Sequence, residues 1–182
     1  MPAHEPSVEA LLGLAVRHAN AGQPERARML CEHAARIHPP HPGVLQLLAT
    51  LDLQQGAAQS ACSRAEDSLV LRPDHSPTLR LLADAWFQRA LQAHDLKQLD
   101  LAAEALRTVL QLAPGRAEAE VNLGIVLQES GRLDEALRAY GRAYRLREDS
   151  FGRIAHALAT ANVGRLWLRL DDLRASLRGM PA

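Results

Sequence analysis

The sequence is poor in aromatic residues, and this shortage excludes most sheet-containing folds. Aromatics make up 3% of the 182 residues although hydrophobic residues make up 47%, so the apolar content is mostly Ala and Leu. Both are strong helix formers, whereas the β-branched and aromatic residues that favour strands are scarce. We therefore expect an all-α protein, with enough apolar residues to form a folded core rather than a disordered chain.

Lysine, cysteine and long apolar runs are also scarce. Lys97 is the only lysine, and 21 basic residues balance 21 acidic ones, which argues against a generic nucleic-acid binder. Cys31 and Cys62 form neither a CxxC motif nor a disulfide framework. No run of 18 apolar residues occurs, and residues 1–6 lack the basic start of a secretory signal. These absences predict no membrane span and a cytoplasmic location.

What the sequence does contain is a repeat of 34 residues. Gly22 and Gly56 are separated by this interval, as are Ala27 and Ala61. A third copy carries seven extra residues in its second half, and a fourth is the clearest. The matched positions across the copies are Leu11, Leu14, Ala15, Ala27 and Pro39; Leu45, Leu48, Ala49, Ala61 and Pro73; Leu79, Leu82, Ala83, Ala102 and Pro114; and Leu123, Gly124, Gly131, Ala136 and Tyr140.

This pattern resembles the tetratricopeptide repeat family, whose motif is W-x2-L-G-x2-Y, then A-x3-F, then P. The resemblance covers about residues 8–150 and implies a right-handed superhelix of about four helix-turn-helix repeats, closed by a C-terminal capping helix pair. The ranges we assign are a flexible N-terminus (1–7), repeat 1 (8–41), repeat 2 (42–75), repeat 3 with its insertion (76–116), repeat 4 (117–150) and the cap (151–182).

Three departures from the motif stand out. No copy has Trp in the first slot, and Glu148 replaces the terminal Pro of the fourth copy. Asp52 occupies a slot where a bulky group is usual, so we expect the second repeat to pack loosely. Gly22, Gly56 and Gly131 fall in the turns within repeats, where glycine tolerates a positive φ.

Two segments depart from the repeat. The seven extra residues of repeat 3, around 90–96, are close to two helical turns and predict a longer first helix; they form either a tolerated insertion or a contact ridge. After Ser150 the spacing predicts one more helix, a break at 162–164 and an amphipathic helix from Leu166 to Met180. A short strand at 165–170 is the alternative. This region either caps the solenoid or offers Trp167 and Leu168 to a partner chain.

No motif for catalysis or phosphate binding occurs, and we expect no enzyme activity, no cofactor and no metal. The densest group of possible metal ligands contains Cys31, His33, His38 and His41. Cys31 and His33 lie on different faces of a helix, and zinc needs three or four ligands. The arginines between Arg138 and Arg153 are interleaved with acids and lack an aromatic platform, so we expect a solvated face rather than a nucleic-acid site.

The resemblance implies that the first helices of successive repeats line a concave groove. Partners of this family bind there as extended peptides or helices. The groove-facing residues expected by phase are Leu12, Val16, Asn20, Gln46, Thr50, Arg80, Asp84, Val121, Asn122, Ile125 and Gln128. The carboxylate clamp known in one branch of the family is missing, because Leu12 and Val16 occupy its positions. An apolar groove with a polar middle suits an amphipathic helix.

The sequence therefore predicts a non-enzymatic protein-interaction scaffold or adaptor, bacterial in style, that binds a partner segment in its groove. One alternative is a regulatory or targeting subunit or domain of a bacterial glycosyl- or sulfotransferase. Another is self-association, in which the C-terminal helix docks on a second copy. Mutating Leu12 or Ile125 to Asp is expected to abolish partner capture without loss of helicity.

Overall fold

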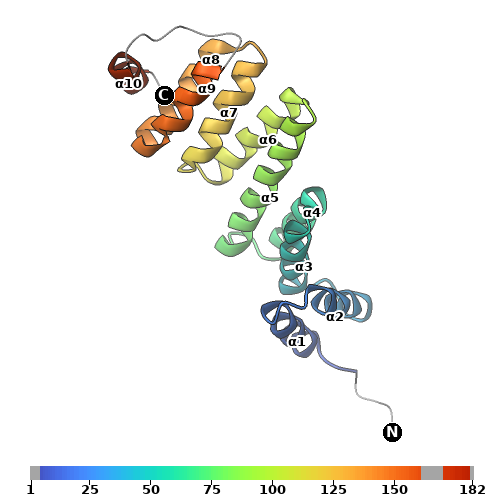
Figure 1. Ribbon diagram of the computed structural model, residues 1–182. Helices are drawn as coiled ribbons and strands as arrows, with labels where there is room; N and C mark the ends of the chain where they lie inside the picture. The colour runs from blue at the N-terminus through green and yellow to red at the C-terminus, as the bar shows by residue number, and fades with distance from the viewer. Residues whose placement is uncertain (1–4, 161–169, 181–182) are drawn as a thin grey trace. The chain divides into compact units, whose positions relative to one another are not determined.

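The computed structural model describes residues 5–160 and 170–180, which form helices and no strand (Figure 1). The all-α fold class is confirmed. The helices are α1 (Val8–Asn20), α2 (Pro24–Ile37), α3 (Pro42–Gln54), α4 (Ala58–Leu71), α5 (Ser76–Asp95), α6 (Leu99–Leu112), α7 (Ala117–Glu129), α8 (Leu133–Leu146), the 3-10 turn η1 (Glu148–Ser150), α9 (Phe151–Thr160) and α10 (Leu170–Gly179).

The chain forms two compact units, residues 1–85 and residues 86–182, and the boundary between them falls inside α5. In the first unit, α1 pairs with α2 and α3 pairs with α4 as hairpins, and α2 packs on α3. In the second unit, α7 pairs with α8, α6 packs on α7, and α10 packs on α8. Stacking of neighbouring hairpins within each unit buries the apolar face that a single hairpin would leave exposed.

The turns within repeats share one backbone conformation. Gly22, Gly56 and Gly131 each lie two residues after a first helix, with φ of 70°, 78° and 78°, as their positions predicted. Lys97 occupies the corresponding place after α5 with a φ of 57°. In all four turns, the residue that follows donates its N–H to a carbonyl in the last turn of the helix, for example Gln98 to Ala93 at 2.9 Å.

The turns that follow α2, α4 and α6 each contain a proline. Pro39, Pro73 and Pro114 each follow two residues after the end of α2, α4 or α6, where proline cannot continue the helix. Glu148 stands where a fourth proline would lie, and here the chain passes through η1 directly into α9.

The insertion of the third repeat lengthens its first helix. Helix α5 has 20 residues, whereas α1, α3 and α7 have 13 each. Seven residues add about two turns, so the buried face keeps its phase along the helix.

Asp52 does not loosen the second repeat as expected. Its side chain is buried and pairs with Arg28 of α2 at 2.8 Å and with Arg64 of α4 at 2.7 Å. The carboxylate therefore joins the two helices that flank α3. A long arginine from each side fills the space that a bulky apolar residue takes in other copies.

The C-terminal helices cover the end of the second unit. Ile154 and Leu158 of α9 and Leu173 and Leu177 of α10 are buried in its core. Arg145 of α8 donates to the carbonyl of Met180 at 2.7 Å, and so holds the carboxyl end of α10. This packing agrees with capping. The expected break at 162–164, the alternative strand, and Leu166, Trp167 and Leu168 lie outside the described residues.

Candidate functional site

The expected groove residues of the first unit lie on α1, α3 and the first half of α5. Val16, Asn20, Arg80 and Asp84 are exposed, and Gln46 and Thr50 are half-buried. The Thr50 hydroxyl donates to the Gln46 carbonyl at 2.9 Å, so it is already bound to its own helix.

Leu12 has a structural role that the sequence did not indicate. It is half-buried against the core of the first unit, and it lies over Gly43 of α3. A Cβ at position 43 would come within 2.7 Å of Leu12 Cδ2. A charge at position 12 would therefore disturb the contact of α1 with α3 as well as any binding surface.

In the second unit, two of the four expected groove residues are not open contact residues. Val121 is 1% exposed and belongs to the core, and Gln128 is 6% exposed. Gln128 accepts a hydrogen bond from the Tyr140 hydroxyl at 2.8 Å and donates to the Ala157 carbonyl at 3.2 Å. Val121 is thus occupied by core packing and Gln128 by its bonds to α8 and α9, which the periodicity of a single helix does not show.

Ile125 and Gln128 nevertheless border a pocket of about 640 Å³ in the second unit. We call it the α7–α9 pocket because those two helices supply most of its lining. Its apolar lining is Leu99, Ile125 and Ala157, and its polar lining is Lys97, Gln128, Glu129, Tyr140, Arg153, His156 and Thr160.

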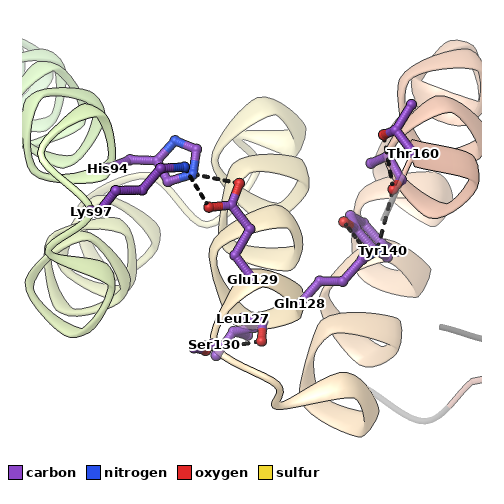
Figure 2. A network of polar contacts seen from close by, with 9 residues as sticks. His94, Lys97, Leu127, Gln128, Glu129, Ser130, Tyr140 and Thr160 are labelled. Atoms are coloured by element: carbon purple, nitrogen blue, oxygen red, sulfur yellow. Dashed lines mark hydrogen bonds and ion pairs between the residues drawn. The ribbon is translucent and has the colours of Figure 1, made fainter. Parts of the chain in front are cut away.

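The floor of the α7–α9 pocket depends on a close fit between α7 and α8. Gly124 of α7 faces the Tyr140 ring, which a Cβ at position 124 would overlap. Tyr140 is fully buried, and burial raises the pKa of its hydroxyl. The neutral phenol donates to Gln128, which in turn binds the α9 backbone (Figure 2). These two hydrogen bonds thus link α7, α8 and α9.

One rim of the pocket is a small charge network, seen at the upper left of Figure 2. His94 Nε2 lies 2.9 Å from Glu129 Oε1, and Lys97 Nζ lies 3.1 Å from Glu129 Oε2. Burial acts to raise the pKa of Glu129, but the hydrogen bonds from His94 and Lys97 outweigh it, and the pKa is lowered. The carboxylate is therefore ionised at neutral pH and holds the α5–α6 turn to α7.

The other rim carries Arg153 of α9. Its guanidinium donates to Asn122 Oδ1 at 3.2 Å and lies 4.0 Å from Glu118. Asn122 is half-buried, and its place in a partner-binding groove stays a prediction. Arg153 also borders a smaller pocket of about 320 Å³, which Val121 and Ser150 help to line.

Sequence reasoning missed Lys97, Glu129, His156 and Thr160 as pocket residues. A signal existed for Lys97: it is the only lysine, and it stands where three other copies have glycine in the turn. His156 and Thr160 lie on α9, where the repeat motif fades, so motif phase gave no guide to their direction.

Two of the possible metal ligands considered in the sequence, Cys31 and His38, lie in contacts that belong to the fold. Cys31 is fully buried, and burial raises the pKa of its thiol to about 11. His38 Nε2 lies 2.9 Å from the Pro6 carbonyl oxygen. Within the described residues, no three His, Cys, Asp or Glu side chains form a possible metal site.

The arginines between Arg138 and Arg153 are largely engaged within the fold. Arg142 makes a two-pronged pair with the buried Glu120, at 2.7 and 2.9 Å. Arg147 pairs with Asp149, and Arg145 holds α10.

None of the helices in the described ranges combines the length and the hydropathy that a membrane span requires.

Comparison with known proteins gives two matches to models of the tetratricopeptide repeat, over residues 8–51 and 93–163. The chain is 40% identical over 80 residues to the probable biofilm formation methyltransferase WspC of Pseudomonas putida, covering 44% of this chain and 19% of that protein. It is 27% identical over 142 residues to the human protein O-mannosyl-transferase TMTC1, covering 78% and 16%. The chain thus spans less than a fifth of the length of either relative.

A solved structure, MamA from residue 41 to the end from Desulfovibrio magneticus RS-1, superposes with a TM-score of 0.61. The match has 21% identity and covers 96% of this chain and 91% of that chain, which supports the fold alone. The repeat matches, the helix pairs and the glycine and proline turns agree with one another. The chain belongs to the tetratricopeptide repeat family.

Proposed function

We propose that the chain holds a segment of a partner protein in the α7–α9 pocket. Tetratricopeptide repeats of this kind support a protein-interaction scaffold, and the fold is typically non-catalytic. A bacterial source and a cytoplasmic location remain predictions from the sequence.

The observation that carries the proposal is the mixed lining of this pocket. Ile125, Leu99 and Ala157 offer apolar contact, whereas Lys97, His156 and Thr160 provide hydrogen-bonding groups around them. The volume of about 640 Å³ suits a few side chains of a partner rather than a whole domain. An amphipathic helix or extended segment meets this combination, because its apolar side chains enter the pocket while its polar groups meet the rim.

The floor of the pocket is rigid enough to serve as a template. The Gln128 side chain is satisfied at both ends, by Tyr140 and by the Ala157 carbonyl, so a ligand need not pay to order it. Rim residues such as Lys97, whose side chain is 72% exposed, remain able to adjust to a ligand.

The test begins with partners co-purified from the native cells and identified by mass spectrometry. Ile125→Asp is expected to weaken capture of the specific partner at least tenfold, because a charge would enter the apolar lining. Leu101→Asp is the matched control, since Leu101 is 52% exposed on α6 and does not line the pocket. Equal capture by both variants at unchanged helicity would refute this location. Leu12→Asp is a poor test of binding, because Leu12 also packs on Gly43.

A second candidate is an accessory role for a transferase, as a subunit or as part of a longer chain. It is supported by the two relatives named for methyltransferase and O-mannosyl-transferase, of which this chain spans 19% and 16%. A glycosyl- or sulfotransferase partner, as the sequence suggested, belongs to the same class of role. The neighbouring genes and any sequence beyond Ala182 test this second candidate, since an adjacent or fused transferase domain would support it. A transferase that co-purifies with the wild type but not with Ile125→Asp would support both candidates together.

A further inference from the structure

The first repeat exposes a face that the other three repeats bury. Leu14, Leu48, Leu82 and Leu123 occupy the same slot of the repeat, and they are 38%, 4%, 6% and 3% exposed. The positions that flank this slot on the same helix face show the same difference in exposure. Ala10 and Arg17 are exposed, whereas their counterparts Val44, Thr78 and Ala119, and Leu51, Ala85 and Val126, are buried.

The cover over this face in later repeats is the second helix of the preceding repeat. Leu48 and Leu51 pack in one cluster with Ala27 and Cys31 of α2. Likewise α6 packs on α7, where Leu123 and Val126 share a core with Leu106 and Val109. The face of α1 defined by Ala10, Leu14 and Arg17, which we call the head face, thus has the form of a stacking surface for a helix of that type.

Among the described helices, α10 near the other end of the chain has an open outer side. Helix α10 packs on α8 through Leu173 and Leu177, which are buried. Its opposite side exposes Asp172, Ala175 and Gly179, which we call the tail face. Ala175 and Gly179 are small enough for another helix to approach closely, as small residues do between the hairpins of this chain.

The two faces match in spacing and charge when the helices run antiparallel. Asp172, Ala175 and Gly179 then lie opposite Arg17, Leu14 and Ala10, since both triplets are spaced by three and four residues along one side of a helix. The acid at the amino end of α10 meets the base at the carboxyl end of α1, and Leu14 meets the small residues. Second helices also run antiparallel to the first helix that follows them, through the short turns between repeats.

We propose that the head face of one copy docks on the tail face of a second copy. Such a contact uses different surfaces on the two copies, so it adds copies in a ring or filament instead of closing as a dimer. It lies outside the α7–α9 pocket, and its test is independent of the proposed partner.

The experiment is sedimentation velocity of the full chain at increasing concentration. We expect the average mass of the wild type to rise past that of a dimer. Leu14→Glu blocks the head and Ala175→Glu blocks the tail, so each variant alone is expected to remain monomeric. A mixture of the two leaves one intact head and one intact tail, and it is expected to stop at a dimer. Val70→Glu, at a residue 80% exposed on α4, is the control and assembles like the wild type.

Charge reversal provides a second test that leaves the apolar contact in place. Arg17→Asp or Asp172→Arg alone is expected to weaken association about tenfold, and the double variant to recover it. This test also holds if Leu14→Glu loses helicity by circular dichroism.

Three results would overturn the proposal. A wild type that stays monomeric at millimolar concentration excludes it. A mixture of blocked variants that remains monomeric also excludes it. Assembly that Leu14→Glu abolishes but Ala175→Glu leaves intact would instead show two head faces meeting around a two-fold axis.

Discussion

The two units of the chain bury very different side chains. Residues 1–85 contain both cysteines and no aromatic residue, whereas all the aromatic residues lie in 86–182. The core of the first unit combines small residues such as Ala15 and Cys31 with leucines such as Leu48, whereas that of the second also contains Tyr140 and Tyr144. The same repeat thus tolerates a core without aromatic side chains and a core that contains them.

The difference shows how each core is stabilised. Small and aliphatic side chains bury less apolar area per residue than aromatic ones, and apolar burial is the dominant stabilising term. The first unit adds the buried Asp52, which binds an arginine from each flanking helix. Among the described residues of the second unit, the buried acid Glu120 pairs with Arg142 of its own hairpin, and aromatic side chains add to the apolar core. The buried ion pairs of Asp52 therefore contribute in the first unit where aromatic packing contributes in the second.

The largest expected effect is that the first unit unfolds at lower denaturant than the second. Both thiols are buried in the first unit, so a thiol reagent reports its opening. Both tyrosines lie in the second unit, so tyrosine fluorescence reports that one. We expect thiol reaction to be complete before tyrosine fluorescence changes. Coincident transitions would mean that the two units unfold as one.

Gly124→Ala is expected to reverse this order. The added methyl group overlaps the Tyr140 ring, and such overpacking costs about 1–3 kcal/mol. The loss is measured as a lower urea midpoint by tyrosine fluorescence. Gly152→Ala, where a Cβ meets nothing within 4 Å, is the control and should not destabilise. Tyr140→Leu is expected to rescue Gly124→Ala, because the third copy of the motif carries Ala83 and Leu106 at these two positions; failure of that rescue would contradict the steric explanation.

Asp52→Ala is expected to destabilise the first unit by about 2 kcal/mol, the loss of charged hydrogen bonds to two arginines. The cost stays moderate because Arg28 and Arg64 are 17% and 31% exposed and can regain water. Thiol reactivity should rise about thirtyfold. Asp52→Leu is expected to cost less, since Leu127 fills this slot in the fourth copy. The exposed pair of Arg147 and Asp149 is the control: Asp149→Ala should leave thiol reactivity unchanged.

The smallest effect concerns pH and the second unit alone. The lowered pKa of Glu129 means that the folded state binds a proton less readily there than the unfolded state. Its stabilising contribution is therefore present above the ordinary carboxyl pKa of about 4.3 and is lost as pH falls below it. Glu129→Gln should flatten this acid dependence when stability is followed by tyrosine fluorescence. An unchanged slope would mean that other carboxylates dominate.

Much of the fold followed from the sequence because the repeat fixes it locally. Glycine and proline positions predicted the turns, and the matched small and large residues predicted which helix faces pack. The lengthening of α5 followed from the size of the insertion. These features depend on residues close in the chain, which is why one sequence sufficed.

The site was harder to predict because it depends on contacts between repeats. The periodicity of α7 placed Val121 and Gln128 in the groove, but both are buried, and Gln128 is bound to α8 and α9. Asp52 is an unfavourable residue by motif, and only the distant Arg28 and Arg64 account for it. Likewise nothing near Leu14 in the chain distinguishes it from Leu48, since the difference lies in what packs above each.

The turn conformation of Lys97 has a practical consequence. The only side-chain amine of this chain projects into solvent at the rim of the α7–α9 pocket, on a backbone fixed in the left-handed region. An amine-directed fluorophore would therefore label one internal position, beside the proposed partner site, without any engineered residue. Any enzyme that acylates lysine would likewise find a single target here, and neutralising that charge would release one of the two groups that hold Glu129.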